Sequence, residues 1–161
     1  MLILTRMTRA EFPAFFELSA ASYAEDSVAA GRWQSSEAFS LARAETNRLL
    51  PSGADSPDAF LRVIRREEDP SPVGYLWFAT PLKDGRKVAF LYHLLIVPSF
   101  RRRGYGREAL RAFEAEAATL GCDAVALNVF VPNEAARRLY ESAGYDTTAV
   151  SMRKSLPDRQ N

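Results

Sequence analysis

A basic, glycine-containing stretch lies between an aliphatic run and a helical pattern. It reads Arg101-Arg102-Arg103-Gly104-Tyr105-Gly106 and follows Leu94-Leu95-Ile96-Val97. The free N–H groups at the start of a helix, together with the helix dipole, form a site for an anion. Glycine lets the backbone approach a phosphate and adopt a positive φ, and arginine adds charge and paired donors. The stretch therefore predicts a phosphate site, best suited to a diphosphate. For the three arginines alone, a solvated basic turn is the alternative.

Two other phosphate-binding patterns fit less well. The P-loop pattern G-x-x-x-x-G-K-[ST] does not occur. Gly104 to Ala109 formally matches G-x-G-x-x-A of dinucleotide-binding loops, and Asp123 lies about 20 residues further on. In that fold, however, the glycine loop leaves its strand directly and the acidic residue ends the next strand. Here residues 98–103 separate Val97 from Gly104, and Asp123 precedes the next predicted strand. Dinucleotide binding therefore remains an alternative function for this glycine-containing stretch.

The charge balance limits the classes of partner. The chain has 161 residues, which suits one domain, with 21 basic and 20 acidic side chains and a formal charge of +1. Five arginines and one glutamate lie between residues 99 and 113, so a small basic patch sits on a mildly acidic body. We expect no nucleic-acid partner. No uncharged stretch is longer than that over residues 88–100, which is too short to cross a membrane.

One cysteine, Cys122, and one histidine, His93, limit the chemistry further. A single cysteine excludes an intrachain disulfide and a cysteine-based zinc site. A single histidine excludes a two-histidine metal motif, so we expect no metal. These counts and the lack of a signal peptide favour a cytoplasmic protein. The excess of arginine over lysine and the abundance of alanine indicate a GC-rich bacterial genome.

The periodicity of apolar residues predicts a mixed α/β (α+β) fold. Helical spacing alternates with period-two and solid apolar runs, and glycines and prolines separate them. The expected strands cover residues 2–5, 59–65, 73–80, 86–97, 124–131 and 145–156, and the expected helices cover 9–24, 35–49, 107–120 and 134–143. We expect an antiparallel meander over 59–97 and a right-handed parallel crossover from 88 to 131. A single domain is expected over 1–156, with a short tail over 157–161.

Two motifs together resemble the GNAT superfamily of N-acetyltransferases. The first, [Q/R]-x-x-G-x-[G/A] after an aliphatic strand and a proline, matches Arg101 to Gly106. The second combines L-N-V, N-x-x-A and L-Y-x-x-x-G-[FY], which occur here as Leu127-Asn128-Val129, Asn133 to Ala136, and Leu139-Tyr140 to Tyr145. The resemblance implies a mixed, mostly antiparallel sheet with a splayed pair of parallel strands and flanking helices. It also implies acetyl transfer from acetyl-CoA to a primary amine.

The resemblance also implies a set of residues that bind acetyl-CoA. The pantetheine arm would pair with the strand backbone at Leu94, Leu95 and Ile96, and the pyrophosphate would bind the N–H groups of the basic stretch. The matched positions are Leu94, Leu95, Ile96, Arg101, Arg102, Arg103, Gly104, Tyr105, Gly106, Arg107, Asn128, Asn133, Ala136 and Tyr140. The alternatives are purely structural roles, in which Asn128 is a strand residue whose amide is hydrogen-bonded within the protein and Asn133 is a helix N-cap.

For the chemistry, the resemblance places a general acid at Tyr140. A phenol with a pKa near 10 stays protonated at pH 7 and could protonate the departing thiolate. The alternative is an aromatic side chain that anchors its helix. Candidate bases are His93, Tyr92 and Glu25, of which His93 has a suitable unperturbed pKa. By strict strand alternation, Tyr92 shares a face with Leu94 and Ile96, and His93 points to the other face unless a bulge rotates it.

The acceptor and the oligomeric state stay open at this stage. A small-molecule amine, a peptide N-terminus and a lysine side chain are all compatible with the sequence. A non-catalytic acyl-CoA-binding module is a further alternative, although the tyrosine at position 140 favours catalysis. A homodimer through strand edges or the last strand is a further expectation from the resemblance.

Overall fold

The computed structural model describes residues 1–158, so part of the expected tail over 157–161 lies outside the described residues. The elements follow the expected order as far as the fourth long helix. They are β1 (Leu2–Arg6), α1 (Phe12–Ala29), α2 (Ser35–Leu49), β2 (Phe60–Arg66), β3 (Asp69–Ala79), β4 (Leu82–Lys83), β5 (Arg86–Ile96), α3 (Tyr105–Thr119), β6 (Ala124–Leu127) and α4 (Glu134–Ser142). None of the helices in this part of the chain combines the length and apolar character that a membrane crossing requires.

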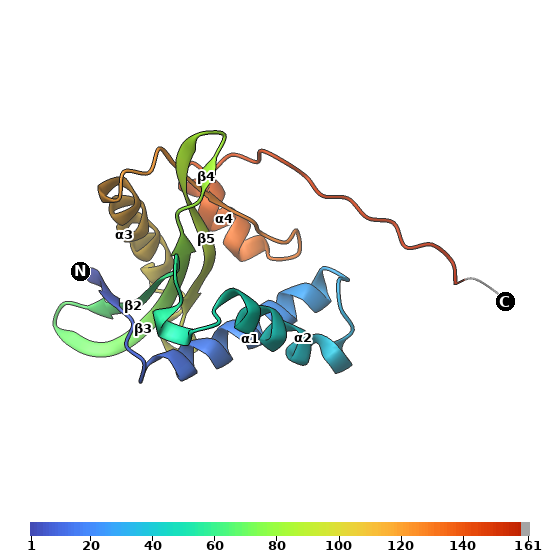
Figure 1. The fold of residues 1–161 in the computed structure, drawn as a ribbon, viewed down its shortest axis with the longest axis horizontal. Coiled ribbons are helices and arrows are strands. Elements are labelled where there is room, and N and C mark those ends of the chain that lie inside the picture. Colours follow the sequence, from blue (N-terminus) through green and yellow to red (C-terminus); the bar gives the residue numbers. More distant parts are fainter. Residues whose placement is uncertain (159–161) are drawn as a thin grey trace.

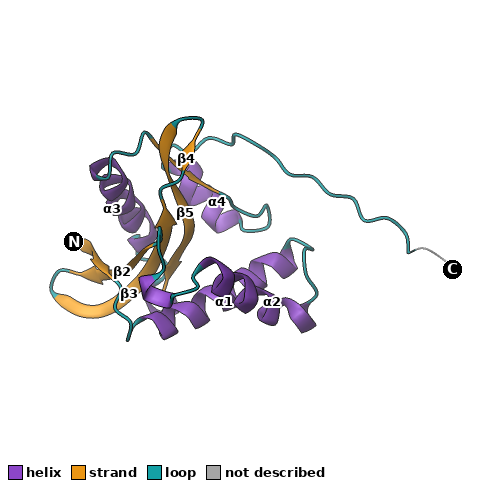
Figure 2. Cartoon of the chain, in the orientation of Figure 1, coloured by secondary structure: helices purple, strands orange, loops and turns teal. Residues whose placement is uncertain are grey.

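The strands form one mostly antiparallel sheet in the order β1-β2-β3-β5-β4, with β6 pairing β5 in parallel. This arrangement confirms the predicted fold class and the parallel crossover. Helices α1 and α2 lie side by side along one part of the sheet, and α3 lies apart from them (Figures 1 and 2). Two apolar clusters divide the core accordingly. Phe113 of α3 packs with Phe78 and Leu91, whereas Phe15 of α1 packs with Trp77 and Leu95.

A bulge in β5 changes which face its residues occupy. Trp77 of β3 pairs with His93, but the next residue, Phe78, pairs with Leu91, so Tyr92 is an extra residue. Leu91 packs in the cluster on the α3 side, and after the bulge Leu94 does so too. The expectation that Tyr92 shares a face with Leu94 is therefore wrong. Tyr92 stacks on Trp77, which belongs to the cluster on the α1 side, with ring centroids 4.6 Å apart.

The contact between β3 and β5 just beyond the bulge is unusually close. A Cβ atom placed on Gly74 would lie 2.1 Å from the carbonyl oxygen of Leu95. The oxygen in this contact belongs to the backbone of β5, so no side chain could move aside to make room. Glycine at position 74 therefore allows the close approach of β5 to β3.

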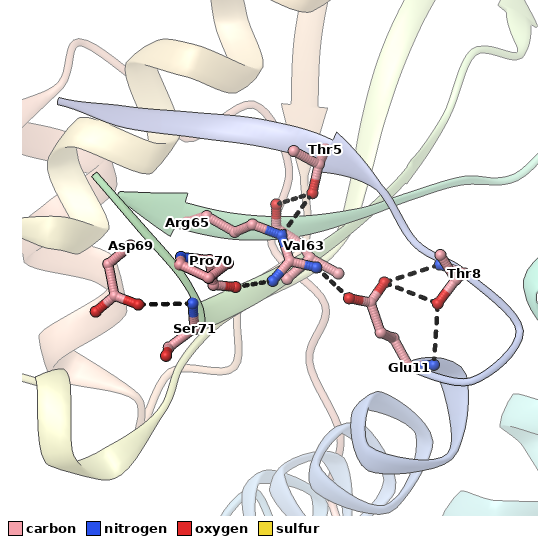
Figure 3. A network of polar contacts seen from close by, with 8 residues as sticks. All are labelled: Thr5, Thr8, Glu11, Val63, Arg65, Asp69, Pro70 and Ser71. Atoms are coloured by element: carbon pink, nitrogen blue, oxygen red, sulfur yellow. Dashed lines mark hydrogen bonds and ion pairs between the residues drawn. The ribbon is translucent and has the colours of Figure 1, made fainter. Parts of the chain in front are cut away.

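A reciprocal capping box fixes the start of α1. The N–H of Glu11 donates to Thr8 Oγ1 at 3.3 Å, and the Glu11 carboxylate accepts from the N–H of Thr8 at 2.9 Å. Arg65 of β2 pairs with the same carboxylate and donates to Thr5 Oγ1 at 3.0 Å, as Figure 3 shows. Burial alone would raise the pKa of Glu11, but the bonds from Thr8 and Arg65 outweigh it and lower that pKa. The start of α1 is thus tied to the sheet.

The C-terminal segment differs from the expectation. The strand predicted over 145–156 is wrong, since the structure has no strand there. Figure 1 shows the segment running away from the body of the molecule. Its apolar side chains do alternate as in a strand, but Val150, Met152 and Leu156 are 72%, 90% and 79% exposed. The segment lacks the neighbouring strand that such a pattern needs.

Candidate functional site

The sheet opens between β5 and β6. The two strands pair only from Val88 with Ala124 to Leu91 with Leu127. β6 then ends, whereas β5 continues to Ile96. The strand expected over 124–131 is therefore shorter than predicted, and the chain beyond Leu127 diverges from β5 as a loop. The edge of β5 over 92–96 that faces away from β3 has no partner strand among the described residues.

The aliphatic side chains of β5 at this opening are held by the core. Leu94 and Ile96 pack on the α3 side, and Leu95 is buried on the α1 side. The carbonyl of Ile96 accepts from Nε of Arg101 at 3.0 Å. Because the side chains are fixed on the two faces, the backbone of this strand is what the opening presents to a ligand.

The basic stretch forms a turn directly before α3. Gly104 is the N-cap of α3, with a left-handed φ of +81°. Nothing would crowd a Cβ at this position, so the need for glycine comes from the φ angle rather than from space. α3 begins at Tyr105, two residues earlier than predicted. The N–H groups of Tyr105, Gly106 and Arg107 therefore lie in the first turn, where a helix offers no internal acceptor.

The arginines of this turn are partly oriented by their neighbours. Arg101 bonds Ile96 as described, and the Arg103 guanidinium lies 5.7 Å from the ring centre of Phe100. Arg107 donates to Ser142 Oγ of α4 at 2.7 Å. Arg102 is exposed and has a positive φ of +63°. Positive charge thus surrounds the first turn of α3, as an anion site requires.

The two matched asparagines occupy different environments. Asn128 directly follows β6 and is exposed. Asn133 is the N-cap of α4, and its Oδ1 accepts from the N–H of Ala136 at 3.2 Å. Its Nδ2 points the other way and makes a long contact of 3.5 Å with Oδ2 of Asp26 on α1. Asn133 therefore caps its helix and at the same time joins α4 to α1.

Tyr140 lies on α4 behind this cap. Its ring packs against the cluster on the α3 side and lies 5.7 Å from that of Tyr145. Burial raises the pKa of Tyr140 to about 12, and the nearby Asp26 carboxylate adds to the shift. The phenol therefore anchors the helix and is also protonated across the physiological pH range.

The three base candidates differ in their surroundings. His93 Nδ1 lies 2.7 Å from Ser19 Oγ of α1, and loss of solvation lowers the pKa of His93 to about 4. Tyr92 is 43% exposed and stacks on Trp77. Glu25 is exposed on α1. The imidazole is thus neutral near pH 7 and a weaker base than a free histidine.

Asp26, beside Glu25, was missed by the sequence analysis. It is half-buried, and its carboxylate faces α4. A helical spacing over Ser19, Tyr23 and Asp26 would have been the signal, since these positions share one face of α1. The structure joins them to the opening through three different partners, His93, Phe130 and Asn133. Within residues 1–158, no group of three His, Cys, Asp or Glu side chains could hold a metal ion.

The surroundings of His93 predict a pH dependence of stability. In the unfolded chain the imidazole takes a proton near pH 6.5, whereas in the native protein it resists protonation until about pH 4. The unfolded state therefore binds more protons in this window, and the free energy of unfolding falls as the pH falls. Between pH 7 and pH 5 this loss should be about 2 kcal/mol larger for the natural chain than for His93→Asn.

Urea unfolding of both proteins at pH 7 and pH 5 measures this difference. His93→Asn keeps an acceptor near Ser19 Oγ but does not titrate in the window. Equal acid sensitivity of the two proteins would show that His93 is solvated like a free histidine.

The comparisons with known proteins agree with this geometry. The model of the acetyltransferase (GNAT) family matches residues 14–145. Two proteins of Bacillus subtilis (strain 168), both called uncharacterized N-acetyltransferases, are similar over nearly their whole length. YdgE is 34% identical and covers 95% of this chain and 97% of its own, and YycN is 33% identical and covers 96% and 99%.

Solved structures point to the same group of proteins. The crystal structure of YycN, titled as an acetyltransferase, superposes with a TM-score of 0.90 at 32% identity, over 98% of this chain and 100% of that one. An acetyltransferase structure from Pyrococcus furiosus superposes with a TM-score of 0.69 at 23% identity, which concerns the fold alone. On these matches, the chain belongs to the GNAT family of N-acetyltransferases.

Proposed function

We propose that the protein moves the acetyl group of acetyl-CoA directly to a primary amine, with Tyr140 as the general acid. GNAT enzymes use acetyl-CoA as cosubstrate, whose thioester supplies the activated acetyl group. One observation carries the proposal. The unpaired edge of β5 and the first turn of α3 border the same opening, and α4, which carries the protonated phenol of Tyr140, is joined to that turn by the bond from Arg107 to Ser142.

The chain's own residues fit this cosubstrate. A pantetheine arm carries amide groups, which suit the unpaired strand edge at Leu94 to Ile96 and the exposed amide of Asn128. A diphosphate suits the free N–H groups from Tyr105 to Arg107, with Arg101, Arg102 and Arg103 supplying charge. For Asn133 and Ala136, which bond each other at the start of α4, we propose a supporting role.

For the chemical step, Tyr140 would give its proton to the departing thiolate. A phenol that stays protonated near neutral pH is ready for this role in every turnover. His93, Tyr92 and Glu25 stay predictions for proton removal from the amine. The bond from His93 to Ser19 favours a positioning role for His93, because that ring nitrogen is already occupied.

Calorimetry tests the binding half of this proposal. We expect about one acetyl-CoA bound per chain and no binding of NAD(H). Gly104→Val should weaken acetyl-CoA binding by at least about 10-fold, because a branched side chain disfavours the left-handed φ that forms the turn. Gly121→Val is the matched control, since Gly121 follows α3 with a similar φ of +77° and open space around it. Binding of NAD(H) without acetyl-CoA would refute the proposal in favour of dinucleotide binding.

The catalytic half predicts the effect of Tyr140→Phe. The variant keeps the packing of the ring but removes the proton, so turnover should fall about 10- to 1000-fold with little change in acetyl-CoA affinity. Tyr145→Phe serves as control, because it removes a phenol hydroxyl from the neighbouring ring, whose centre lies 5.7 Å from that of Tyr140, and Tyr145 has no assigned role in the reaction. CoA release during an amine and peptide screen is the readout. Undiminished turnover in Tyr140→Phe would show that Tyr140 only packs against its neighbours and is not the general acid.

We also propose a homodimer, formed by the C-terminal segment. The exposed apolar side chains of Val150, Met152 and Leu156 alternate with polar ones. β6 pairs with β5 on one edge and has no strand on its other edge within the described residues. An extended segment with a period-two pattern would complete that edge on a second copy of the chain.

Light scattering on the full chain tests this arrangement. The natural protein should have twice the mass of one chain, and the double variant Val150→Lys with Met152→Lys should have the mass of one. The double variant Ser151→Lys with Ser155→Lys is the control, because it adds the same two charges to the other face of the extended segment. A natural protein that is monomeric at high micromolar concentration would contradict the pairing of the C-terminal segment with β6 of a second copy.

We also propose a cytoplasmic location for the protein. Its single cysteine, Cys122, is free, and the cytoplasm keeps thiols reduced.

A further inference from the structure

One face of α1 borders the opening opposite to the first turn of α3. Ser19, Tyr23 and Asp26 follow each other along this face. Ser19 reaches His93 of β5, and the ring of Tyr23 stacks at 6.4 Å on Phe130, in the loop after β6. Asp26 comes last, toward the start of α4. The face thus continues from the sheet to the helix that carries Tyr140.

Asp26 is a carboxylate without a cation beside it. Among the described residues, no basic nitrogen lies within ion-pair distance of its oxygens. Its side-chain partner among the described residues is the neutral amide of Asn133, at 3.5 Å, which by itself lowers the pKa of Asp26. The charge of Asp26 in turn raises the pKa of Tyr140. Burial raises the pKa of Asp26, with Glu25 adding to the shift. A half-buried carboxylate in this state favours a cation as its partner.

The cations that could reach Asp26 from the chain itself have other partners. The nearest along α1 and its following loop is Arg32, which pairs with Glu45 and donates to the hydroxyl of Tyr23. Its guanidinium also lies 4.6 Å from the ring centre of Trp33. Arg153 of the C-terminal segment donates to the carbonyl of Gly31. The charge of Asp26 is therefore left for a ligand.

We infer that Asp26 binds the ammonium group of the acceptor and receives its proton, so that the acceptor is a primary amine that is protonated in solution. This inference rests on the proposed acetyl transfer and names the acceptor class and the residue that recognises it. Tyr23 and Phe130, stacked beside Asp26, provide an apolar wall for the carbon chain that carries the ammonium group.

The proton and electron transfers balance with these residues. The ammonium nitrogen gives one proton to Asp26, and its lone pair then forms the C–N bond to the thioester carbonyl carbon. The C–S bond breaks as Tyr140 gives its phenolic proton to sulfur. The nitrogen loses a second proton, which restores Tyr140 through solvent, and Asp26 releases its proton to water. One ammonium ion and one thioester give one amide, one thiol and one proton.

The position of Asp26 couples the two proton transfers. Its negative charge raises the pKa of Tyr140, so an ionised Asp26 opposes loss of the phenolic proton. When Asp26 takes the proton of the ammonium group, this opposition disappears. Tyr140 then gives up its proton more readily at the stage at which the thiolate departs.

Asp26→Asn tests the inference, with Glu37→Gln as the control, because Glu37 is an exposed carboxylate on the neighbouring helix α2 and has no assigned role in binding or catalysis. The probes are n-butylamine, which is protonated at pH 8, and 2,2,2-trifluoroethylamine, which is neutral there, each with acetyl-CoA and CoA release as readout. Asp26→Asn should lower kcat/KM for n-butylamine about 10- to 100-fold, because a hydrogen bond between two charged groups is lost. The loss for trifluoroethylamine should be at least about fivefold smaller, and Glu37→Gln should change neither value more than about twofold.

Acetyl-CoA calorimetry on each variant separates the outcomes. Equal losses for the two amines in Asp26→Asn would overturn the assignment, since a merely structural role would affect both alike. Equal effects of Asp26→Asn and Glu37→Gln would also overturn it. If the natural protein binds acetyl-CoA but acetylates neither probe nor any amine in the screen, the proposed function itself fails and Asp26 loses its role with it.

Discussion

Parallel strands β5 and β6 share hydrogen bonds over only four residues each, Val88–Leu91 and Ala124–Leu127, and then separate. A backbone edge that loses its partner strand must find other hydrogen bonds or water. β5 stays paired with β3 as far as Ile96, where Gly74 allows the close approach, so the separation is taken up on the side of β6. The groups assigned to the reaction come from β5, the loop after β6, the turn before α3 and its first helical turn, α1 and α4.

The bulge at Tyr92 determines how β5 presents its residues to that separation. One extra residue moves His93 to the α1 side, where Ser19 meets it, and leaves Leu94 packed under α3. The capping box and Arg65 then fix the start of the helix on which Ser19, Tyr23 and Asp26 lie. A local feature of one strand and a local feature of one helix start thus set the relative positions of side chains that are distant in sequence.

The sequence predicted the elements around the opening well, because their signals are local. Glycine at position 104, the aliphatic run before it and the N-cap at Asn133 each carry their own structural preference. Asp26 was not predicted, because its role depends on α1 meeting α4, a contact between residues 107 positions apart. The bulge at Tyr92 was not predicted for a similar reason, since only the register with β3 reveals it. The strand expected over 145–156 has the right alternation, but alternation alone supplies no neighbouring strand.

The side-chain amide of Asn133 makes one contact through its oxygen and another through its nitrogen, and this limits which residues could replace it. Serine, threonine and aspartate cap helices about as well as asparagine. None of them can accept from Ala136 and also turn an amide N–H toward Asp26, and aspartate would bring a second negative charge beside it. An exchange that is neutral by the rules of helix stability would therefore change the electrostatics of the opening. Stability measurements alone would overlook such a variant, and a library selected for folding would retain it.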